Sequence, residues 1–469
     1  MSIIQLAKQS VIYGFGHIIS RLITFLLLPI LTVSLTTNEF GIISKFYAFS
    51  SFAMAFYRYG MDTALMKFYI QKKNSKLYFS SILILQILSS LIFSILILIF
   101  SEYLSVLVFG VYNFKYVLFM IIIIFSDIIW NLNTITLRAE KKPFPFIVLN
   151  LTNVISILIL TIHFVNNNSM GIEGVLYANV LGSLLTLGLS LVLLVKRFSF
   201  NAIDLSIVSP ILKFGIPFLP AAIFAMIIES SDRFILAYLM NDHYVGIYSA
   251  TYKLGVFGLL LVMAFNMGWT PFFLQHGKEK NAHKDFATIQ TFFLGIMGFL
   301  GILLTIVIPQ IIHWDFMGYR LIGVSFVDGL FILPIILMSY YFFGLYVLLL
   351  PKIYILEKTY IIPIVRGIGA LSNILLNFTL IPIWGILGAA LASLGAYILM
   401  FISMFWITNK LQPTTYNTWG WFFPIFMWLI VIFVQNNILF ISVLTIYPIV
   451  WYTLVLNTFE KEKIKEFFV

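Results

Sequence analysis

The sequence places ten ionisable side chains inside long apolar stretches, where a charge needs a polar partner. Six are basic and four are acidic, so ion pairing alone cannot neutralise them all. An excess of cation suits an anionic ligand, because guanidinium groups bind phosphate oxygens in bidentate fashion and stay charged. The pattern therefore favours an anionic ligand, and a phosphate-bearing group is one that suits it. The basic residues are Arg21, Lys45, Arg58, Arg233, Lys253 and Arg366, and the acidic residues are Asp62, Asp127, Glu229 and Asp232.

Arg21 and Arg58 are the leading candidates for ligand contact, since both fall near mid-depth of the first two apolar stretches. An arginine at the centre of a membrane helix costs at least ~2.5 kcal/mol, so it normally faces a polar interior. His17 precedes Arg21 by one helical turn and shares its face. For both arginines a structural ion pair or hydrogen bond is the alternative, and Asp62 is one turn beyond Arg58. The predicted substrate-binding set is Arg21, Arg58, Arg233, Arg366, Lys253 and His17.

The acidic residues suggest a second kind of site. Glu229, Asp232 and Arg233 fall on one predicted helix, and Glu229 precedes Arg233 by four residues, the favourable order for an ion pair. This cluster is either a self-satisfied pair or a coupling site where a proton or sodium ion competes with Arg233 for a carboxylate. We predict Glu229, Asp232 and Asp62 as ion-coupling residues. Lys45 is close to the end of its stretch and is expected to reach the membrane interface.

Sequence motifs of other chemistries are absent. The chain has no cysteine, so disulfides and thiolate metal sites are excluded. No histidine pair has metal-ligand spacing, and neither a P-loop nor a nucleophile elbow occurs. We therefore predict a protein that is not an enzyme, with no catalytic residues, no metal and no cofactor.

Composition sets the class of protein. Of the 469 residues 61% are hydrophobic and only 10% are charged, with a mean hydropathy of +1.03. Soluble domains average about 25% charged residues, so the chain is expected to be an all-α polytopic membrane protein. Its net charge of +10 does not indicate nucleic acid, because the basic residues fall in short loops between apolar stretches.

About fourteen transmembrane helices are expected, because a span needs about 20 apolar residues. Barrel strands are excluded, since they would alternate apolar and polar residues. The weakest spans are the last two, separated only by Gln435-Asn436-Asn437. The predicted spans are 10–35, 41–66, 78–100, 116–137, 144–165, 171–195, 211–239, 246–273, 288–312, 327–350, 360–381, 384–408, 418–434 and 438–457.

The loops predict the orientation. With both termini in the cytoplasm, the inner segments hold twenty of the 28 lysines and arginines and the outer segments hold two. This is a strong positive-inside bias. We therefore expect a multi-pass protein of the bacterial cytoplasmic (inner) membrane with both termini cytoplasmic.

Three sequence matches in the same order indicate an internal repeat. NEFGIIS at 38–44 resembles HYVGIYS at 243–249, and Met-Ala-Phe at 54–56 recurs at 263–265. Gly171-Ile172-Glu173-Gly174 resembles Gly385-Ile386-Leu387-Gly388. Small-residue helix packing accounts for the last motif alone, but not for the ordered set. Spans 1–6 and 7–12 thus read as two six-helix lobes in parallel orientation, and transporters built from such repeats bind substrate between them.

In this order and spacing the chain resembles the multidrug/oligosaccharidyl-lipid/polysaccharide exporter superfamily, and within it the flippases of O-antigen and capsular repeat units. The resemblance rests on Arg21 with Pro29, on Glu39-Phe40-Gly41, on KFGIPFLP at 213–220, on Ser231-Asp232-Arg233 and on GIYSA at 246–250. It covers nearly the whole chain. It implies an N-terminal lobe at 1–197, a C-terminal lobe at 198–410, and two extra helices with a short cytoplasmic tail at 411–469.

The same resemblance implies the function. The chain would translocate a polyprenyl-diphosphate-linked oligosaccharide by alternating access through a cationic central cavity. Its expected partners are this lipid-linked oligosaccharide and membrane lipids, with H+ or Na+ and the polysaccharide polymerase machinery as further candidates and no nucleic acid. Three alternatives stay open: a cation-coupled multidrug exporter of the same superfamily, a peptidoglycan-precursor flippase, and a membrane-embedded polysaccharide polymerase. Short outer loops disfavour the polymerase.

Overall fold

The structure is a computed structural model that describes residues 3–71, 74–277, 279, 282–312, 314–316, 319–433 and 437–468. Nearly all of these residues are helical. The α-helices are α1 (Ile3–Ser34), α2 (Thr37–Arg58), α3 (Met61–Gln71), α4 (Ser75–Ile99), α5 (Ser101–Phe109), α6 (Phe114–Ala139), α7 (Pro143–Thr161), α8 (Gly171–Arg197), α9 (Val208–Gly215), α10 (Leu219–Leu239), α11 (Asp242–His276), α12 (Ala282–Ile311), α13 (Leu333–Ile355), α14 (Ile361–Trp384), α15 (Ile386–Leu411), α16 (Thr418–Phe433), α17 (Asn437–Val450) and α18 (Thr458–Phe468).

Shorter elements connect or extend these helices. Two antiparallel strands of two residues each pair Asp315 with Arg320. The shorter elements are the π-helical segments η1 (Ile162–Asn167) and η6 (Trp451–Val455), the 3-10 segments η2 (Phe200–Ala202), η3 (Leu205–Ile207), η4 (Ile216–Phe218) and η5 (Val324–Ile332), and the strands β1 (Asp315–Phe316) and β2 (Tyr319–Arg320).

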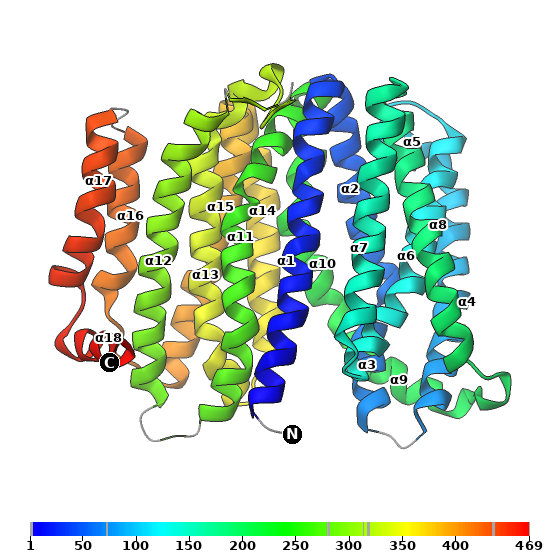
Figure 1. The fold of residues 1–469 in the computed structure, drawn as a ribbon, viewed down its shortest axis with the longest axis horizontal. Coiled ribbons are helices and arrows are strands. Elements are labelled where there is room, and N and C mark those ends of the chain that lie inside the picture. The colour runs from blue at the N-terminus through cyan, green and yellow to red at the C-terminus, as the bar shows by residue number, and fades with distance from the viewer. Residues whose placement is uncertain are drawn as a thin grey trace. The chain divides into compact units, whose positions relative to one another are not determined.

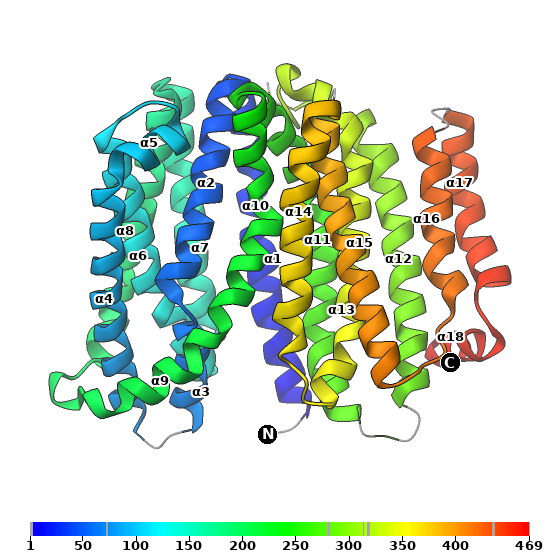
Figure 2. The same ribbon diagram turned by 180° about the vertical axis from the view of Figure 1, so that it is seen from behind.

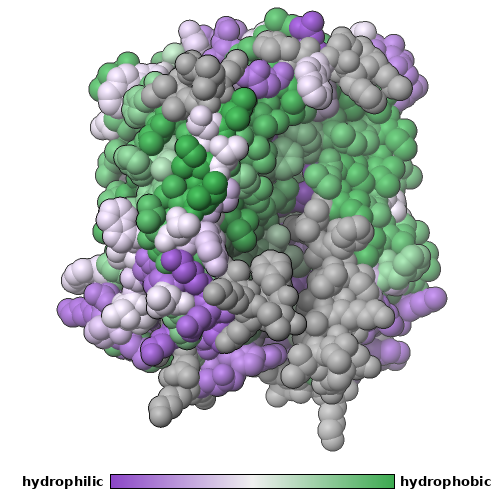
Figure 3. Space-filling model, turned by 60° about the vertical axis from the view of Figure 1, so that its left-hand side comes forward, coloured by the Kyte–Doolittle hydropathy of each residue, from purple (hydrophilic) through white to green (hydrophobic). Residues whose placement is uncertain are grey.

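The all-α membrane fold is confirmed. Ten helices or continuous helical segments of the described residues are long and apolar enough to cross a bilayer. Three further apolar helices are shorter. The remaining predicted span, 41–66, corresponds to α2 and α3 together. Figure 3 shows one face on which hydrophobic side chains gather in a broad band between hydrophilic ends, as expected of a surface that faces lipid.

The N-terminal unit comprises Met1–Ser249 with the short segment Ile322–Phe326. In it α7 packs against α1 and α8, and α6 packs against α8 and α4 (Figures 1 and 2). The distant segment joins this unit through α1, because the Gly323 amide donates to Thr32 Oγ1 at 3.0 Å. Phe326 also meets Phe40 of α2 edge to face, with ring centroids 5.3 Å apart.

The C-terminal unit comprises Ala250–Leu321 and Val327–Val469. Its most buried span contains α13, which packs against α12 and α15. A helix that is apolar on every side is expected at such a position. The last helices join the unit through α12, because Trp428 of α16 donates its indole N–H to Thr305 at 3.0 Å and Tyr447 of α17 donates to the Gly295 carbonyl at 2.8 Å. The predicted lobe limits at 197 and 410 stay predictions.

The second span is broken, which the sequence analysis did not predict. Helix α2 starts with a capping box, in which Thr36 and Glu39 satisfy each other's backbone N–H groups. It ends where Tyr59 and Gly60 adopt left-handed φ values of 30° and 82°, and α3 begins directly afterwards. A Cβ at position 60 would lie 1.9 Å from the Gly215 carbonyl oxygen. Glycine at 60 thus permits both the break and the close approach of the α9 end.

The internal repeat is visible in the backbone. Gly171 and Gly385, which the sequence match makes equivalent, have φ values of 55° and 56° at the starts of α8 and α15. Three residues later, Gly174 and Gly388 each pack close to the end of the preceding helical segment. The two halves of the chain therefore build this turn in the same way.

Candidate substrate and coupling sites

Arg58 is the last residue of α2, at the break in the second span. Its NH1 atom lies 3.4 Å from Asp62 Oδ2, and the two side chains are 39% and 30% exposed. Its Nε–H is buried and has no hydrogen-bond acceptor among the described residues. Cations are stabilised at helix C-termini and anions at N-termini, so the ends of α2 and α3 hold this pair in place. The pair foreseen as an alternative role is present, but it leaves part of the guanidinium unused.

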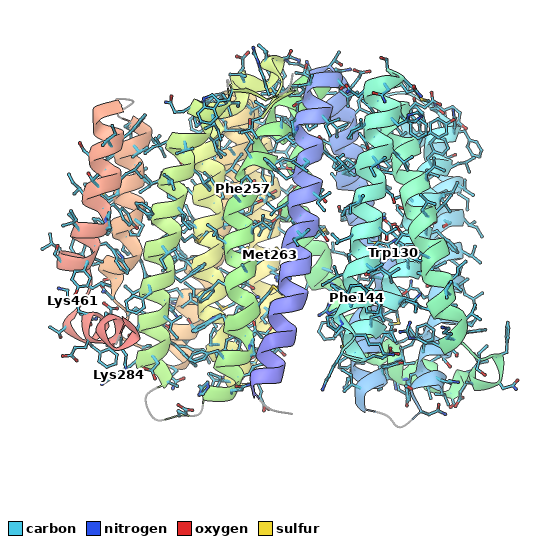
Figure 4. The ribbon with its side chains drawn as sticks, in the orientation of Figure 1. Trp130, Phe144, Phe257, Met263, Lys284 and Lys461 are labelled. Carbon is cyan, nitrogen blue, oxygen red and sulfur yellow. The ribbon has the colours of Figure 1, made fainter. Side chains whose placement is uncertain are left out.

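A second carboxylate of the N-terminal unit, Asp127, also lies within a span. Asp127 of α6 accepts a hydrogen bond from the indole of Trp130 at 2.8 Å, and Ser183 of α8 also bonds to it. It lies within electrostatic range of Arg58. Trp130, labelled in Figure 4, follows Asp127 by three residues on the same helix. That spacing is the only sequence signal for the contact.

The other N-terminal candidates lie on α1. The Arg21 side chain is exposed, in the interior of the helix and far from both ends. His17 belongs to the part of α1 whose side chains lie outside the described residues. An exposed arginine inside a membrane span requires water or a polar neighbour.

The Asp232 cluster lies on α10. Asp232 is fully buried, and its carboxylate accepts a hydrogen bond from the Tyr248 hydroxyl at 2.6 Å and from Arg233 NH1 at 3.0 Å. Arg233 also donates to the backbone carbonyl of Glu229 at 2.6 Å. The Arg233 ion pair is therefore with its neighbour Asp232, and Glu229 contributes a carbonyl oxygen. Both Asp232 oxygens have partners, and Arg233 is the cation with which a proton or sodium ion would have to compete for this carboxylate.

The two C-terminal candidates are half-buried. Lys253 lies on α11, and Arg366 lies on α14 within electrostatic range of Tyr346. Within the part of the chain that the structure describes, no group of three or more His, Cys, Asp and Glu residues could hold a metal ion.

Lys45 was expected to reach the membrane interface, but its side chain forms a buried ion pair instead. Its side chain is only 4% exposed, and its Nζ lies 2.7 Å from Asp242 Oδ1 at the start of α11. The reason is tertiary, because Asp242 comes close only through the crossing of α2 with the first turns of α11. A buried charge is retained when such a partner is present.

Glycine makes that crossing possible. A Cβ at Gly41 would lie 1.9 Å from the Asp242 carbonyl oxygen, and a Cβ at Gly246 would lie 1.9 Å from the Thr37 carbonyl oxygen. The contact is reciprocal between positions that the repeat makes equivalent. Beside it, Thr37 Oγ1 and His243 Nδ1 are 2.6 Å apart. The Glu39-Phe40-Gly41 motif thus serves helix capping and close packing.

The family described as "Polysaccharide biosynthesis protein" matches residues 6–276, more than half of the chain. No curated protein matches the sequence.

Solved structures of transporters share the fold. The lipid II flippase MurJ in an inward closed conformation superposes with a TM-score of 0.76 at 17% identity, covering 94% of this chain and 99% of that one. An inward-facing MATE family multidrug resistance transporter of the MOP superfamily has a TM-score of 0.62 at 12% identity, covering 88% and 97%. The MATE multidrug transporter DinF-BH has a TM-score of 0.62 at 15% identity, covering 86% and 95%. At these identities the likeness concerns the fold alone.

Proposed function

Because the chain belongs to the polysaccharide biosynthesis protein family, we propose that it is a flippase for a polyprenyl-diphosphate-linked oligosaccharide repeat unit. We place it in the bacterial cytoplasmic membrane with both termini in the cytoplasm. The twenty-to-two distribution of basic residues between inner and outer segments supports this orientation. The similar fold of the lipid II flippase supports a lipid-linked substrate.

The observation that carries the proposal is the unused hydrogen-bonding capacity of Arg58. A guanidinium group has five N–H donors. Here one nitrogen forms a long ion pair to a partly exposed carboxylate, and the Nε–H has no acceptor among the described residues. An exposed pair of this kind contributes little to stability, whereas a phosphate accepts several charge-assisted hydrogen bonds. A diphosphate is therefore a suitable ligand for Arg58, with Arg21 as the second cation.

A flippase must compensate for the loss of water around the diphosphate and sugars of its substrate. Moving a charged diphosphate and several sugars through hydrocarbon costs many kcal/mol. A hydrated cationic cavity replaces the lost water contacts while the polyprenyl chain stays in lipid. Access alternates between the two sides of the membrane, and we assign Arg21, Arg58, Arg233, Lys253, Arg366 and His17 to this route.

The test replaces Arg58 in cells that lack their own transporter and measures the exported polymer. We expect Arg58→Ala to reduce export strongly and Arg58→Lys to retain a fraction, because lysine keeps the charge but loses the planar fork. Arg320→Ala is the matched control, since it removes an arginine from β2, outside the spans. Protein abundance and thermal stability are measured for each variant.

Two outcomes would count against the proposal. Full export by the Arg21→Ala, Arg58→Ala double variant at normal abundance would refute diphosphate binding by these arginines. Loss of the folded protein in Arg58→Ala but not in an Arg58→Ala, Asp62→Asn double variant would show that Arg58 merely neutralises Asp62.

A further inference from the structure

A pocket of about 480 Å³ lies at one end of the N-terminal unit, and Arg58 and Asp62 are not among its lining residues. Its walls come from the end of α3, the first turn of α4, the ends of α6 and α8 and the start of α7. Four of these helices, α4, α6, α7 and α8, are long and apolar enough to cross a membrane, and each begins or ends at the pocket. The pocket therefore lies at the level where the bilayer core gives way to the headgroups.

The pocket carries an excess of positive charge. Four basic side chains line it, Lys76, Lys142, Lys196 and Arg197, against the single acid Glu140. This end of the N-terminal unit is also the one at which the basic inner segments lie.

Glu140 is already fully engaged and does not cancel this excess. Arg197 donates to its two oxygens from Nε at 2.9 Å and from NH2 at 2.8 Å, and Tyr69 and Lys142 donate at 2.7 and 2.9 Å. Burial raises the pKa of Glu140, but these hydrogen bonds outweigh burial and lower it to about 2. The carboxylate is thus ionised, and its role is to hold Arg197 and Lys142 in position.

Lys76 and Lys196 remain available to a ligand. Both side chains are exposed, and neither forms an ion pair with any residue that the structure describes. They come from the first turn of α4 and the last turn of α8 and line the same pocket. Two ammonium groups that line one pocket from two different helices can both approach one phosphate group.

Apart from the hydroxyl groups of Tyr69 and Ser75, the rest of the lining is apolar. Phe79, Leu137 and Leu193 contribute to the walls. Outside the pocket the neighbouring surface stays hydrophobic, with Phe144 75% exposed at the start of α7 (Figure 4) and Val195 71% exposed on α8. A free anion in water gains nothing from such a surface, whereas an acyl chain does.

We propose that this pocket binds the headgroup of an anionic phospholipid of the surrounding bilayer. The phosphate lies between Lys76 and Lys196, and the acyl chains extend from the apolar wall along the exposed side chains of α7 and α8. Basic pockets at the inner ends of membrane helices recognise such headgroups. The site is independent of the transported substrate, so it stands or falls separately from the proposed function.

The experiment measures lipid retention by the purified full-length chain in detergent, using native mass spectrometry. Phosphatidylglycerol and phosphatidylcholine with identical acyl chains are titrated separately. We expect wild type to prefer phosphatidylglycerol. We expect the Lys76→Ala, Lys196→Ala double variant to bind phosphatidylglycerol roughly 30-fold more weakly than wild type. This loss corresponds to about 2 kcal/mol of binding free energy for two basic residues near the membrane surface. Arginine at both positions should retain the binding, since it keeps the charge.

The matched control is Lys284→Ala, Lys410→Ala, which removes the same net charge from exposed positions of the C-terminal unit (Figure 4 labels Lys284). This control should bind phosphatidylglycerol as wild type does. Equal loss in both double variants, or equal retention of both lipids by wild type, would refute the proposal. Inorganic pyrophosphate should not displace the lipid, and displacement by it would show instead a site for a soluble or substrate-borne phosphate.

Discussion

Substitution of Gly41 by alanine tests the close crossing of α2 with the start of α11. The new Cβ would lie 1.9 Å from the Asp242 carbonyl oxygen, and distances under 3.0 Å essentially never occur for real Cβ atoms. The two backbones must therefore separate by more than about 1 Å, and over-packing of this kind costs about 1–3 kcal/mol. Gly188 of α8 is the matched control, because a Cβ there meets nothing within 4 Å. Gly188→Ala should gain roughly 0.5–1 kcal/mol from helix propensity.

The assay is unfolding of the purified chain in detergent, with the free energy or midpoint compared between the two variants. The reciprocal substitution Gly246→Ala should cost about as much as Gly41→Ala. The double variant should cost less than the sum, since the first separation already makes room for the second methyl group. Because the chain has no cysteine, a Ser44→Cys label also reports opening at this buried position. The reasoning would be refuted if the Gly41→Ala variant were as stable as the Gly188→Ala variant and showed no increase in labelling at Ser44→Cys.

Three further predictions concern the coupling cluster, the pH response and the topology. Asp232→Asn should weaken the response of transport to an imposed proton or sodium gradient; if transport responds as in wild type, the Asp232 cluster is structural. The pKa of Glu140 falls from an ordinary value of 4.5 to about 2 in the folded chain, so its contribution to stability is fully present above pH 4.5 and is lost as the pH falls from 4.5 toward 2. Glu140→Gln should therefore flatten thermal stability across that range, and an unchanged pH profile would contradict the hydrogen-bonding of this carboxylate. A cysteine at Asn241 should react with an impermeant reagent from outside the cell, and reaction from the cytoplasm alone would reverse the predicted orientation.

The spans could be predicted from the sequence because each depends on a local property, the length of an apolar run. The runs at 78–100 and 116–137 correspond to α4 and α6 with ends shifted by a few residues. The repeat was also readable, since equivalent glycines must meet equivalent backbone demands, as Gly171 and Gly385 do. The pair of Arg58 with Asp62 was foreseen from their spacing of four residues. The structure forms this pair across the break between α2 and α3, and not along one continuous helix as the spacing predicted.

Other features depended on the tertiary structure. The pair of Lys45 with Asp242 joins residues almost 200 positions apart, and no local pattern links them. The break at Tyr59 and Gly60 was missed because an apolar run reads the same whether the helix is continuous or interrupted; only the approach of Gly215 requires the glycine. Likewise, Asp232 lies next to Arg233 in the sequence, but its contact with Tyr248 depends on the packing of α10 and α11. The sequence could place charges within spans to a few residues, whereas their partners follow from helix packing, which brings distant side chains within hydrogen-bonding distance.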